Sequence, residues 1–446
     1  MCAPPGRTAS NRPHPSHRRV VATRDAPQVG GMADPTLRRR QLLIALVFLG
    51  TALNYVDRQV LALLKPTLVA TFGWDDVAFA HLGSAFQVTT AVVLLGAGWL
   101  VDRVGVRRAY GTAVAAWSLA GMAHAVAATI GQFVAARIAL AAAESVNTPA
   151  AVKAAARHLP LAERSLGLGL INTAPNIGAM VTPLLIPPLA LAYGWRAAFV
   201  VTGALGLVWL LAWWPATRWM DAPPVPAEEA AAPAVTPAVA WRDVLADRPT
   251  WAIAGAKGIT DMVWWFLLFW TPDLFNRGFG LAQGQLGAPI ALIYTMAALG
   301  ALSSGLLFPR LLRRGVSVNA ARKGAMLAYG CCILPVPLAL QASSPWGAAL
   351  LIGVALFAHQ GFSTNLFGLA ADVVPVARVA TVVAVGAVCG NLAGMGMIEL
   401  TGWALTSGAG YGPLFLLSAV AYLVATAWIH VMVPVVRVQG EEPTRS

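Results

Sequence analysis

Long apolar stretches dominate the chain, and short polar or basic stretches separate them. A helix that crosses a bilayer needs about 20 mostly apolar residues. Windows of that length predict twelve such helices. They cover residues 41–64, 79–101, 108–130, 132–152, 166–191, 196–215, 249–274, 286–309, 321–341, 346–371, 379–403 and 412–434. The pattern therefore predicts an all-α membrane protein.

Three polar segments divide this pattern. The first is rich in Arg and Pro and has no apolar run, so it is not a secretory signal, and Met32 offers a shorter alternative start. A run of Pro, Ala and Glu between the sixth and seventh helices is typical of a linker. The predicted domains are a basic segment (1–40), a six-helix bundle (41–215), a cytoplasmic linker (216–248), a second six-helix bundle (249–434) and a cytoplasmic tail (435–446).

Composition excludes several classes of protein. Hydrophobic residues make up 58% and charged residues 11% of the 446 residues, whereas a soluble chain carries about 25% charged residues. The net charge of +12 lies in short clusters between apolar segments, which argues against a nucleic-acid partner. The four cysteines show no paired spacing that would indicate disulfides or a metal site. Motifs of metalloproteases, phosphate loops and serine hydrolases are missing, so we expect neither an enzyme nor a cofactor.

Basic residues gather on one side of the predicted helices. The two ends and the connections that follow even-numbered helices hold 25 of the 31 Lys and Arg residues. The other connections hold only Lys65, Arg196 and Arg277. Because Lys and Arg in short loops mark the cytoplasmic side, we expect both ends to lie in the cytoplasm.

The two halves repeat one loop pattern. Residues 98–108 read GWLVDRVGVRR and residues 305–314 read GLLFPRLLRR, and both have a Gly followed by Arg at the fifth and ninth positions after it. Two parallel six-helix repeats with a cavity between them at the membrane midplane are typical of the major facilitator architecture.

The first of these loops also resembles the signature of the major facilitator superfamily, a Gly-x-x-x-Asp-Arg-x-Gly-x-Arg-Arg pattern. The matching positions are Gly98, Asp102, Arg103, Gly105, Arg107 and Arg108. The resemblance implies that Gly98 lets helices approach closely. It also implies that Asp102 faces a neighbouring helix N-terminus and the loop arginines, in a cluster that locks the outward-facing state. The alternative is a basic loop that only sets orientation.

Four further stretches resemble the anion:cation symporter branch of that superfamily and, within it, the hexuronate transporters. They are LNYVDRQVLALLKPTL (53–68), AESVNTPAAVKAAARHLPLAERSLGLGLINTAPNIGAMVTP (143–183), KGITDMVWWFLLFWTPDLF (257–275) and AHQGFSTNLFGLAADVVP (358–375). The resemblance implies proton-coupled uptake of a sugar acid through the inner membrane by alternating access. The expected partners are a small sugar carboxylate and membrane lipid, and the expected state is a monomer.

Seven ionisable residues lie inside predicted membrane helices. They are Asp57, Arg58, Arg137, Glu144, Lys257, Asp261 and Glu399. A charge at a helix centre costs roughly 2.5–3.5 kcal/mol on insertion scales, so each calls for a partner or an aqueous cavity. The helices that carry the first six line the central cavity in this architecture, so we expect these six to face one space. No role is assigned to Glu399.

The resemblance carries proton coupling onto Asp57 and Glu144. Burial in a low-dielectric site favours the protonated form of a carboxyl group, which lets it exchange protons near neutral pH. Arg58 would hold the substrate carboxylate, because a guanidinium makes a two-pronged contact with it. Arg137 is two turns from Glu144 and would modulate it. The alternative is that these are ion pairs that only hold helices together.

Other polar residues would contact the sugar. Lys257 and Asp261 either neutralise each other at their i,i+4 spacing or contact substrate. Neutral donors and acceptors for hydroxyl groups are Tyr55, Asn172, Asn176, His359, Gln360, Ser363, Asn365 and Asn391. Any of the Asn residues could instead bridge helices. His359 could be a second proton site or a neutral hydrogen-bonding group. Trp264 or Trp265 would form a flat wall for a sugar ring.

Some positions depart from the resembled pattern. Thr90 stands where similar symporters have Tyr, Met262 replaces a Pro, and Phe362 replaces a Trp. Pro175 lies in a segment that partly resembles a drug-antiporter signature, which leaves export of lipophilic cations as an alternative function. A transporter-like sensor is a further alternative, although the short tail offers no effector domain.

Overall fold

The computed structural model describes residues 35–221 and 241–436, and their regular secondary structure is helical. The first range contains α1 (Pro35–Leu63), α2 (Lys65–Phe72), α3 (Asp76–Val104), α4 (Val106–Ala123), α5 (Ile130–Glu144), α6 (Asn147–His158), α7 (Leu161–Tyr193) and α8 (Trp195–Ala216). The second contains α9 (Trp241–Ala246), α10 (Arg248–Phe279), α11 (Gly287–Arg313), α12 (Val318–Ile333), α13 (Pro345–Val373), α14 (Val376–Thr406) and α15 (Gly412–Met432). Short 3-10 turns are η1 (His124–Val126), η2 (Arg218–Asp221), η3 (Gln283–Gln285) and η4 (Val336–Gln341).

Each of the twelve predicted segments overlaps one to three consecutive helical pieces. Within the described ranges, nine helices are long and apolar enough to cross a membrane. The predicted spans 41–64, 108–130 and 132–152 are helical without meeting that criterion, so they stay predictions as membrane spans. Most of the predicted N-terminal segment, linker and tail lies outside the described residues.

The predicted fourth helix differs most from the observed structure, because two helices replace it. The first, α5, ends at Glu144, and α6 begins at Asn147. Pro149 explains the break, since proline has no backbone N–H and its ring clashes with the carbonyl four residues earlier. At the break, the hydroxyl of Ser145 donates to the Ala141 carbonyl over 2.7 Å. The break leaves Glu144 at the last position of α5.

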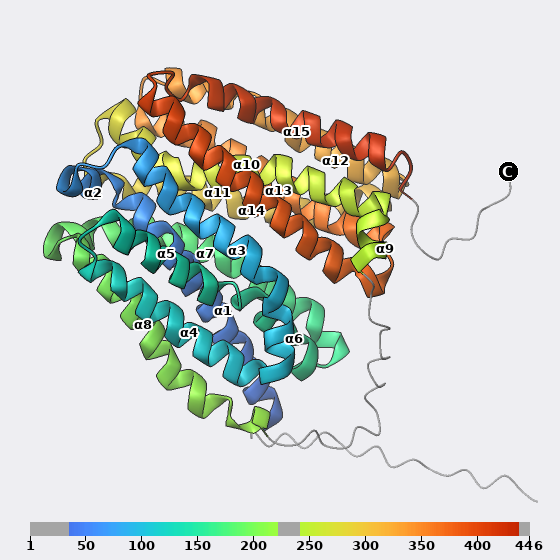
Figure 1. The fold of residues 1–446 in the computed structure, drawn as a ribbon. Helices are drawn as coiled ribbons and strands as arrows, with labels where there is room; N and C mark the ends of the chain where they lie inside the picture. The colour runs from blue at the N-terminus through green and yellow to red at the C-terminus, as the bar shows by residue number, and fades with distance from the viewer. Residues whose placement is uncertain (1–34, 222–240, 437–446) are drawn as a thin grey trace, which may run out of the picture.

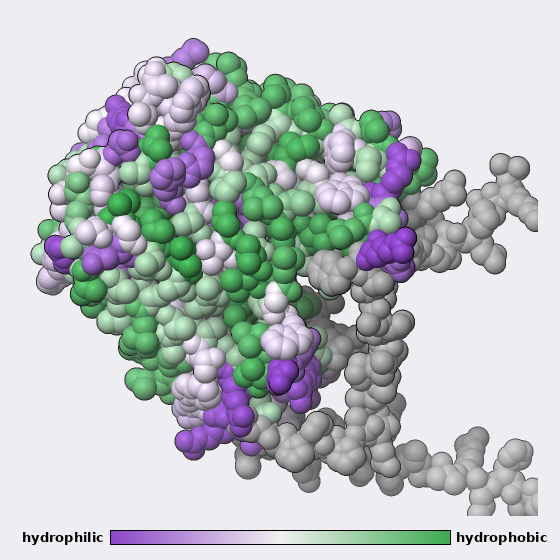
Figure 2. All heavy atoms as spheres, viewed as in Figure 1, coloured by the Kyte–Doolittle hydropathy of each residue, from purple (hydrophilic) through white to green (hydrophobic). Residues whose placement is uncertain are grey.

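The helices form two bundles, α1–α8 and α9–α15, which lie side by side in Figure 1. On the face seen in Figure 2, hydrophobic residues cover the middle of the molecule and hydrophilic residues gather toward its ends. Such an apolar band is what a lipid-facing surface requires. Following the predicted orientation, we call the end that carries Lys65 the outer end and the end that carries Asp102 the inner end.

Glycines let the two bundles approach closely toward the outer end. A Cβ on Gly83 of α3 would lie 2.9 Å from the ring of Phe269 and 3.1 Å from Ile398. A Cβ on Gly402 of α14 would lie 2.7 Å from the Ala80 side chain. A larger residue at either position would push the bundles apart, so these contacts belong to the closed outer end.

An ionic network (Lys65, Asp76, Asp273 and Arg277) joins the bundles at the outer end, and all of its members except Arg277 are buried. Lys65 of α2 is fully buried, and its Nζ lies 2.7 Å from Asp76 of α3 and 2.8 Å from Asp273 of α10. Arg277 pairs with both aspartates. The Lys65 ammonium also lies 4.0 Å from the ring centre of Trp270, within range of a cation–π interaction. Because the network spans both bundles, opening the outer end would separate its buried charges, which is costly.

We expect Lys65→Met to open the outer end. The change leaves two buried aspartates with one arginine, and removing one partner of a buried pair costs about 3–5 kcal/mol. Spin labels at the exposed positions Thr71 and Ala282, one in each bundle, report the opening by double electron–electron resonance in a cysteine-free background. A longer-distance population should appear in the variant.

The matched control for this experiment is Arg322→Met. Arg322 forms an ion pair of similar length, 2.8 Å, with Asp372, but both residues belong to the second bundle. This control should keep the original distance. An unchanged distance in Lys65→Met would mean that helix packing, rather than charge, closes the outer end.

Candidate functional site

An ion pair inside the first bundle joins α1 to α5. The Nε of Arg58 donates to Oε2 of Glu144 over 2.9 Å, and the Glu144 side chain is fully buried. A carboxylate at a helix C-terminus is disfavoured by the helix dipole, and Glu144 ends α5. Arg58 therefore supplies the positive charge that makes this carboxylate tolerable. The pair brings together one predicted substrate-binding residue and one predicted coupling residue.

Asp57 lies on another side of α1. A Cβ on Gly121 of α4 would lie 3.9 Å from its Oδ1. Only 5% of Asp57 is exposed. Asp57 is thus buried within the first bundle, where it faces α4.

Arg137 and Arg58 lie near the same aromatic ring. The guanidinium of Arg137 lies 4.6 Å from the ring centre of Phe86, and that of Arg58 lies 5.3 Å from the same ring. Arg58 also lies 5.0 Å from the ring centre of Tyr55. Neither Nε of Arg137 nor Oε1 of Glu144 has a hydrogen-bond partner among the described residues. The aromatic faces stabilise the two cations without using up their hydrogen bonds.

A small cavity of about 10 Å³ lies between the bundles at this cluster. Both arginines line it. The other lining residues are Gly83, Phe86, Gln87, Trp265, Leu268, Phe269 and Ile398, from α3, α10 and α14. Trp265 therefore lines the cavity, although its role as a sugar wall stays a prediction, and the cavity combines two cations and one amide with an aromatic and apolar surround.

The second bundle holds a separate ion pair. The Nζ of Lys257 donates to Oδ1 of Asp261 over 2.7 Å, so the two residues neutralise each other as one alternative expected. Successive glycines of α14 make room for α10: a Cβ on Gly386 would lie 3.6 Å from Lys257, and one on Gly390 would overlap the Asp261 carboxyl group. The structure therefore divides the six predicted charges between the bundles.

His359 forms a hydrogen-bonded stack within the second bundle. Its Nδ1 lies 2.5 Å from the Tyr422 hydroxyl, and its ring stacks on Trp264 at 4.8 Å between centres. His359 is 4% exposed, and Trp264 is buried. These contacts fix both rings in place.

The predicted neutral residues have varied surroundings. Gln360 donates to Asn176 over 3.0 Å and so connects α13 to α7 across the bundles. Asn365 donates to Ser304, and Asn391 donates to the Ala387 carbonyl. The Oδ1 atoms of these last two lack a partner in the described part of the chain. Ser363 is buried and Asn172 is exposed.

Glu399, to which no role was assigned, also connects the bundles. Its Oε1 lies 2.9 Å from Nδ1 of His81 on α3. The His81 side chain is 58% exposed and the Glu399 side chain 33% exposed, so solvent weakens the contact.

The loop signature forms contacts inside the first bundle. Asp102 pairs with Lys153 of α6, a partner that the sequence pattern did not indicate. Gly105 has φ +86°, a conformation that favours glycine, at the turn between α3 and α4. Arg107 donates to the Trp214 carbonyl over 2.8 Å, and Arg103 lies 5.4 Å from the ring centre of Trp99. Gly98 has no atom within 4 Å of an added Cβ, so the predicted close approach is not present in this conformation.

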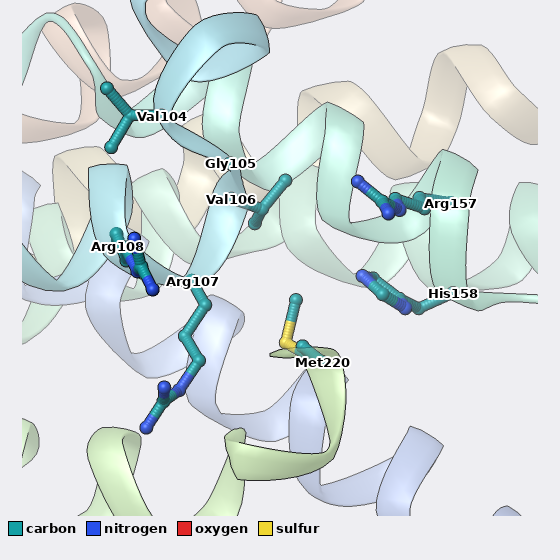
Figure 3. Close-up of a pocket in the computed structure, with 8 residues that line it drawn as sticks. All are labelled: Val104, Gly105, Val106, Arg107, Arg108, Arg157, His158 and Met220. Atoms are coloured by element: carbon teal, nitrogen blue, oxygen red, sulfur yellow. The ribbon is translucent and has the colours of Figure 1, made fainter. Parts of the chain in front are cut away.

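Beside this loop lies a pocket of about 130 Å³ (Figure 3). Arg107 and Arg108 reach it from α4, Arg157 and His158 reach it from α6, and Met220 lies between them. Burial, with a contribution from Arg157, lowers the pKa of His158 to about 4. The pocket therefore takes its positive charge at neutral pH from its arginines.

Sequence reasoning missed the ionic network of the outer end and Gln87. Sequence reasoning counted Lys65 and Arg277 only as loop cations. Acidic residues close to the predicted helix ends, Asp76 and Asp273, are the signal that these cations could form ion pairs. Asp273 stands four residues before Arg277, the spacing at which helix ion pairs form. Gln87 carries no such signal, because a single Gln in an apolar helix has no pattern.

Comparison with known proteins agrees with this architecture. The Major Facilitator Superfamily matches residues 47–398. The hexuronate transporter of Escherichia coli (strain K12) is 30% identical over 401 residues, covering 85% of this chain and 91% of that protein. The D-galactonate transporter of Escherichia coli O6:H1 (strain CFT073) is 26% identical, covering 90% of this chain and 97% of that protein.

A solved structure shares the fold. It is a bacterial homologue of the human lysosomal transporter Spinster, in an inward-facing and unoccupied conformation. The TM-score is 0.74 at 18% identity, covering 90% of this chain and 98% of that one. Together with the loop signature and the paired helical bundles, these matches show that the chain belongs to the major facilitator superfamily, and that its relatives include hexuronate and galactonate transporters.

Proposed function

We propose that this protein is a proton-coupled symporter that imports a sugar acid, of the hexuronate and aldonate class, by alternating access. The observation that carries the proposal is the buried Arg58–Glu144 pair beside a cavity between the bundles. The relatives transport hexuronate and galactonate, which are sugar carboxylates. A guanidinium at the cavity suits such an anion.

The geometry suggests how proton and substrate would be coupled. Glu144 holds the Nε of Arg58 in the conformation described. A protonated Glu144 loses the charge that holds this guanidinium, which then becomes available to a substrate carboxylate. Loss of the proton restores the pair and displaces the substrate. Arg137, whose Nε has no partner in the described ranges, provides a second contact for the anion.

The proposal includes an orientation and a setting. Twelve membrane spans, with both ends in the cytoplasm, place the chain in the inner membrane as a monomer surrounded by lipid. The closed outer end then excludes the outward-facing state, so the lock that the resemblance assigns to Asp102 would be released. No cofactor other than the coupling proton is involved.

Export of lipophilic cations is a weaker alternative. A site for such cations calls for acidic and aromatic residues, whereas two arginines line this cavity. Pro175 remains the feature that favours export, and it lies within α7 together with Pro183, Pro187 and Pro188.

Transport in proteoliposomes tests the function directly. The reconstituted protein should accumulate D-glucuronate or D-gluconate when the outside is more acidic than the inside, because proton entry drives the substrate uphill. A protonophore should abolish accumulation. Uptake that follows a sodium gradient and ignores pH would contradict proton symport.

Glu144→Gln should separate binding from coupling. Gln imitates the protonated carboxyl group, so Arg58 stays available to substrate but no proton can be released. Accumulation driven by a pH gradient should vanish, whereas exchange of internal for external substrate should survive. Both are measured on the same proteoliposomes.

Glu399→Gln is the matched control, because this carboxyl group belongs to a partly exposed contact with His81. It should keep both activities. Loss of exchange in Glu144→Gln would make Glu144 a substrate contact or a structural residue. If both accumulation and exchange survive in Glu144→Gln, Asp57 would be the residue that couples proton transport to substrate transport.

Arg58→Lys should bind substrate roughly 10- to 100-fold more weakly although the charge is kept. The ammonium cannot form the two-pronged contact, and hydrogen bonds to charged groups contribute about 1.5–3 kcal/mol. Tryptophan fluorescence on purified protein would measure the affinity, with Arg322→Lys as a control for a buried pair remote from the cavity. Unchanged affinity in Arg58→Lys would make Arg58 only the structural partner of Glu144.

A further inference from the structure

Gln87 is a buried polar residue that no function above uses. It lies on α3 and lines the cavity beside Arg58 and Arg137. It is 1% exposed, and both its amide nitrogen and its amide oxygen have no hydrogen-bond partner among the residues that the structure describes. A buried amide without partners destabilises a protein. Its presence in a cavity between moving bundles therefore indicates a ligand that supplies both partners.

Gln87 supplies the uncharged amide group of this cavity. The Thr90 hydroxyl, one turn further along α3, donates to the Phe86 carbonyl over 2.9 Å and is thereby occupied. The remaining lining is apolar or aromatic apart from the two arginines. Any ligand group at this point thus meets two cations and one amide.

We propose that Gln87 recognises a hydroxyl group on the carbon next to the substrate carboxylate, so that the preferred substrate is a 2-hydroxy carboxylate such as an open-chain aldonate. This inference rests on the proposed function and narrows its substrate class. Arg58 and Arg137 take the carboxylate. Because Gln87 lines the same small cavity, the group that it meets is attached close to that carboxylate.

The chemistry of the amide separates the two kinds of sugar acid. Gln carries both a donor and an acceptor, and a hydroxyl group can satisfy both by accepting one hydrogen bond and donating another. In the ring form of a hexuronate, the carbon next to the carboxylate bears the ring oxygen, which only accepts. That ligand would leave the Gln87 oxygen buried without a donor, a costly arrangement.

The cavity volume is consistent with recognition of one end of the ligand. About 10 Å³ is close to the space needed for one water molecule. The cavity as described therefore admits one hydroxyl or carboxylate oxygen, and the bundles must separate for the rest of a sugar acid.

Binding of matched acids to Gln87→Leu tests the inference. Wild-type protein should bind D-gluconate at least about tenfold more tightly than 2-deoxy-D-gluconate, and D-glucuronate should also bind more weakly than D-gluconate. In Gln87→Leu, the ratio between gluconate and its 2-deoxy form should fall to about twofold or less. The loss should come from weaker gluconate binding, with the affinity for the deoxy acid kept.

Gln59→Leu is the matched control. Gln59 is 2% exposed, and both its amide atoms also lack partners within the described part of the chain, but it does not line the cavity. Its removal should keep the tenfold ratio. Loss of the ratio in this control, or equal weakening of both acids in Gln87→Leu, would show a packing effect and overturn the inference.

A second variant tests the position of Gln87 relative to the carboxylate. Gln87→Glu keeps the shape of the side chain and adds a negative charge, so binding of both acids should fall sharply. If wild-type protein binds D-gluconate and 2-deoxy-D-gluconate with equal affinity, the proposed role of Gln87 is overturned, while the proposed function is not. Failure of wild-type protein to bind any sugar acid would overturn the proposed function, and this inference with it.

Discussion

The cost of placing charge in an apolar interior governs this structure. Three sets of buried ionic groups have partners that offset their lost hydration: Arg58 with Glu144, Lys257 with Asp261, and Lys65 with two aspartates. Buried pairs of this kind add little net stability, but breaking one leaves an expensive isolated charge. An ion pair in which a substrate carboxylate can replace one partner can thus act as a switch between two bound states.

The locations of these pairs differ in a way that matters for motion. The outer network connects the two bundles, whereas the Arg58–Glu144 and Lys257–Asp261 pairs each stay within one bundle. Relative movement of rigid bundles strains only contacts that cross between them. The outer network and the glycine contacts around Gly83 and Gly402 must therefore change when the outer end opens, while the Arg58–Glu144 and Lys257–Asp261 pairs can move intact.

The sequence predicted the fold well, because twelve apolar windows of bilayer length and the basic loops are strong, local signals. It also drew attention to Arg58, Glu144 and Arg137, since a charge in an apolar helix is conspicuous, but their roles stay predictions. Sequence reasoning could not predict which side of a helix faces the cavity, because that depends on the rotation of the helix about its axis. Neighbouring residues Asp57 and Arg58 point to different surroundings, and only packing of α4 and α8 against α1 decides which one faces the cavity.

Partners far apart in the chain were also beyond sequence reasoning. Lys153 finds Asp102 only because α6 packs against α3. The Gln360–Asn176 bond joins residues 184 positions apart. Such contacts follow from how the two bundles dock, and no local pattern encodes that docking.

Charge balance connects the candidate site to the proposed coupling. Asp57, Glu144, Arg58 and Arg137 interact with one another, and together they are neutral when both carboxyl groups are ionised. A substrate carboxylate added to that state would leave a buried net negative charge, which burial penalises. Protonation of one carboxyl group gives the cluster a single positive charge, and a monoanionic substrate then restores neutrality. Joint binding of one proton and one carboxylate is thus the electrostatically favoured combination, so neutrality in a low-dielectric interior can itself impose symport.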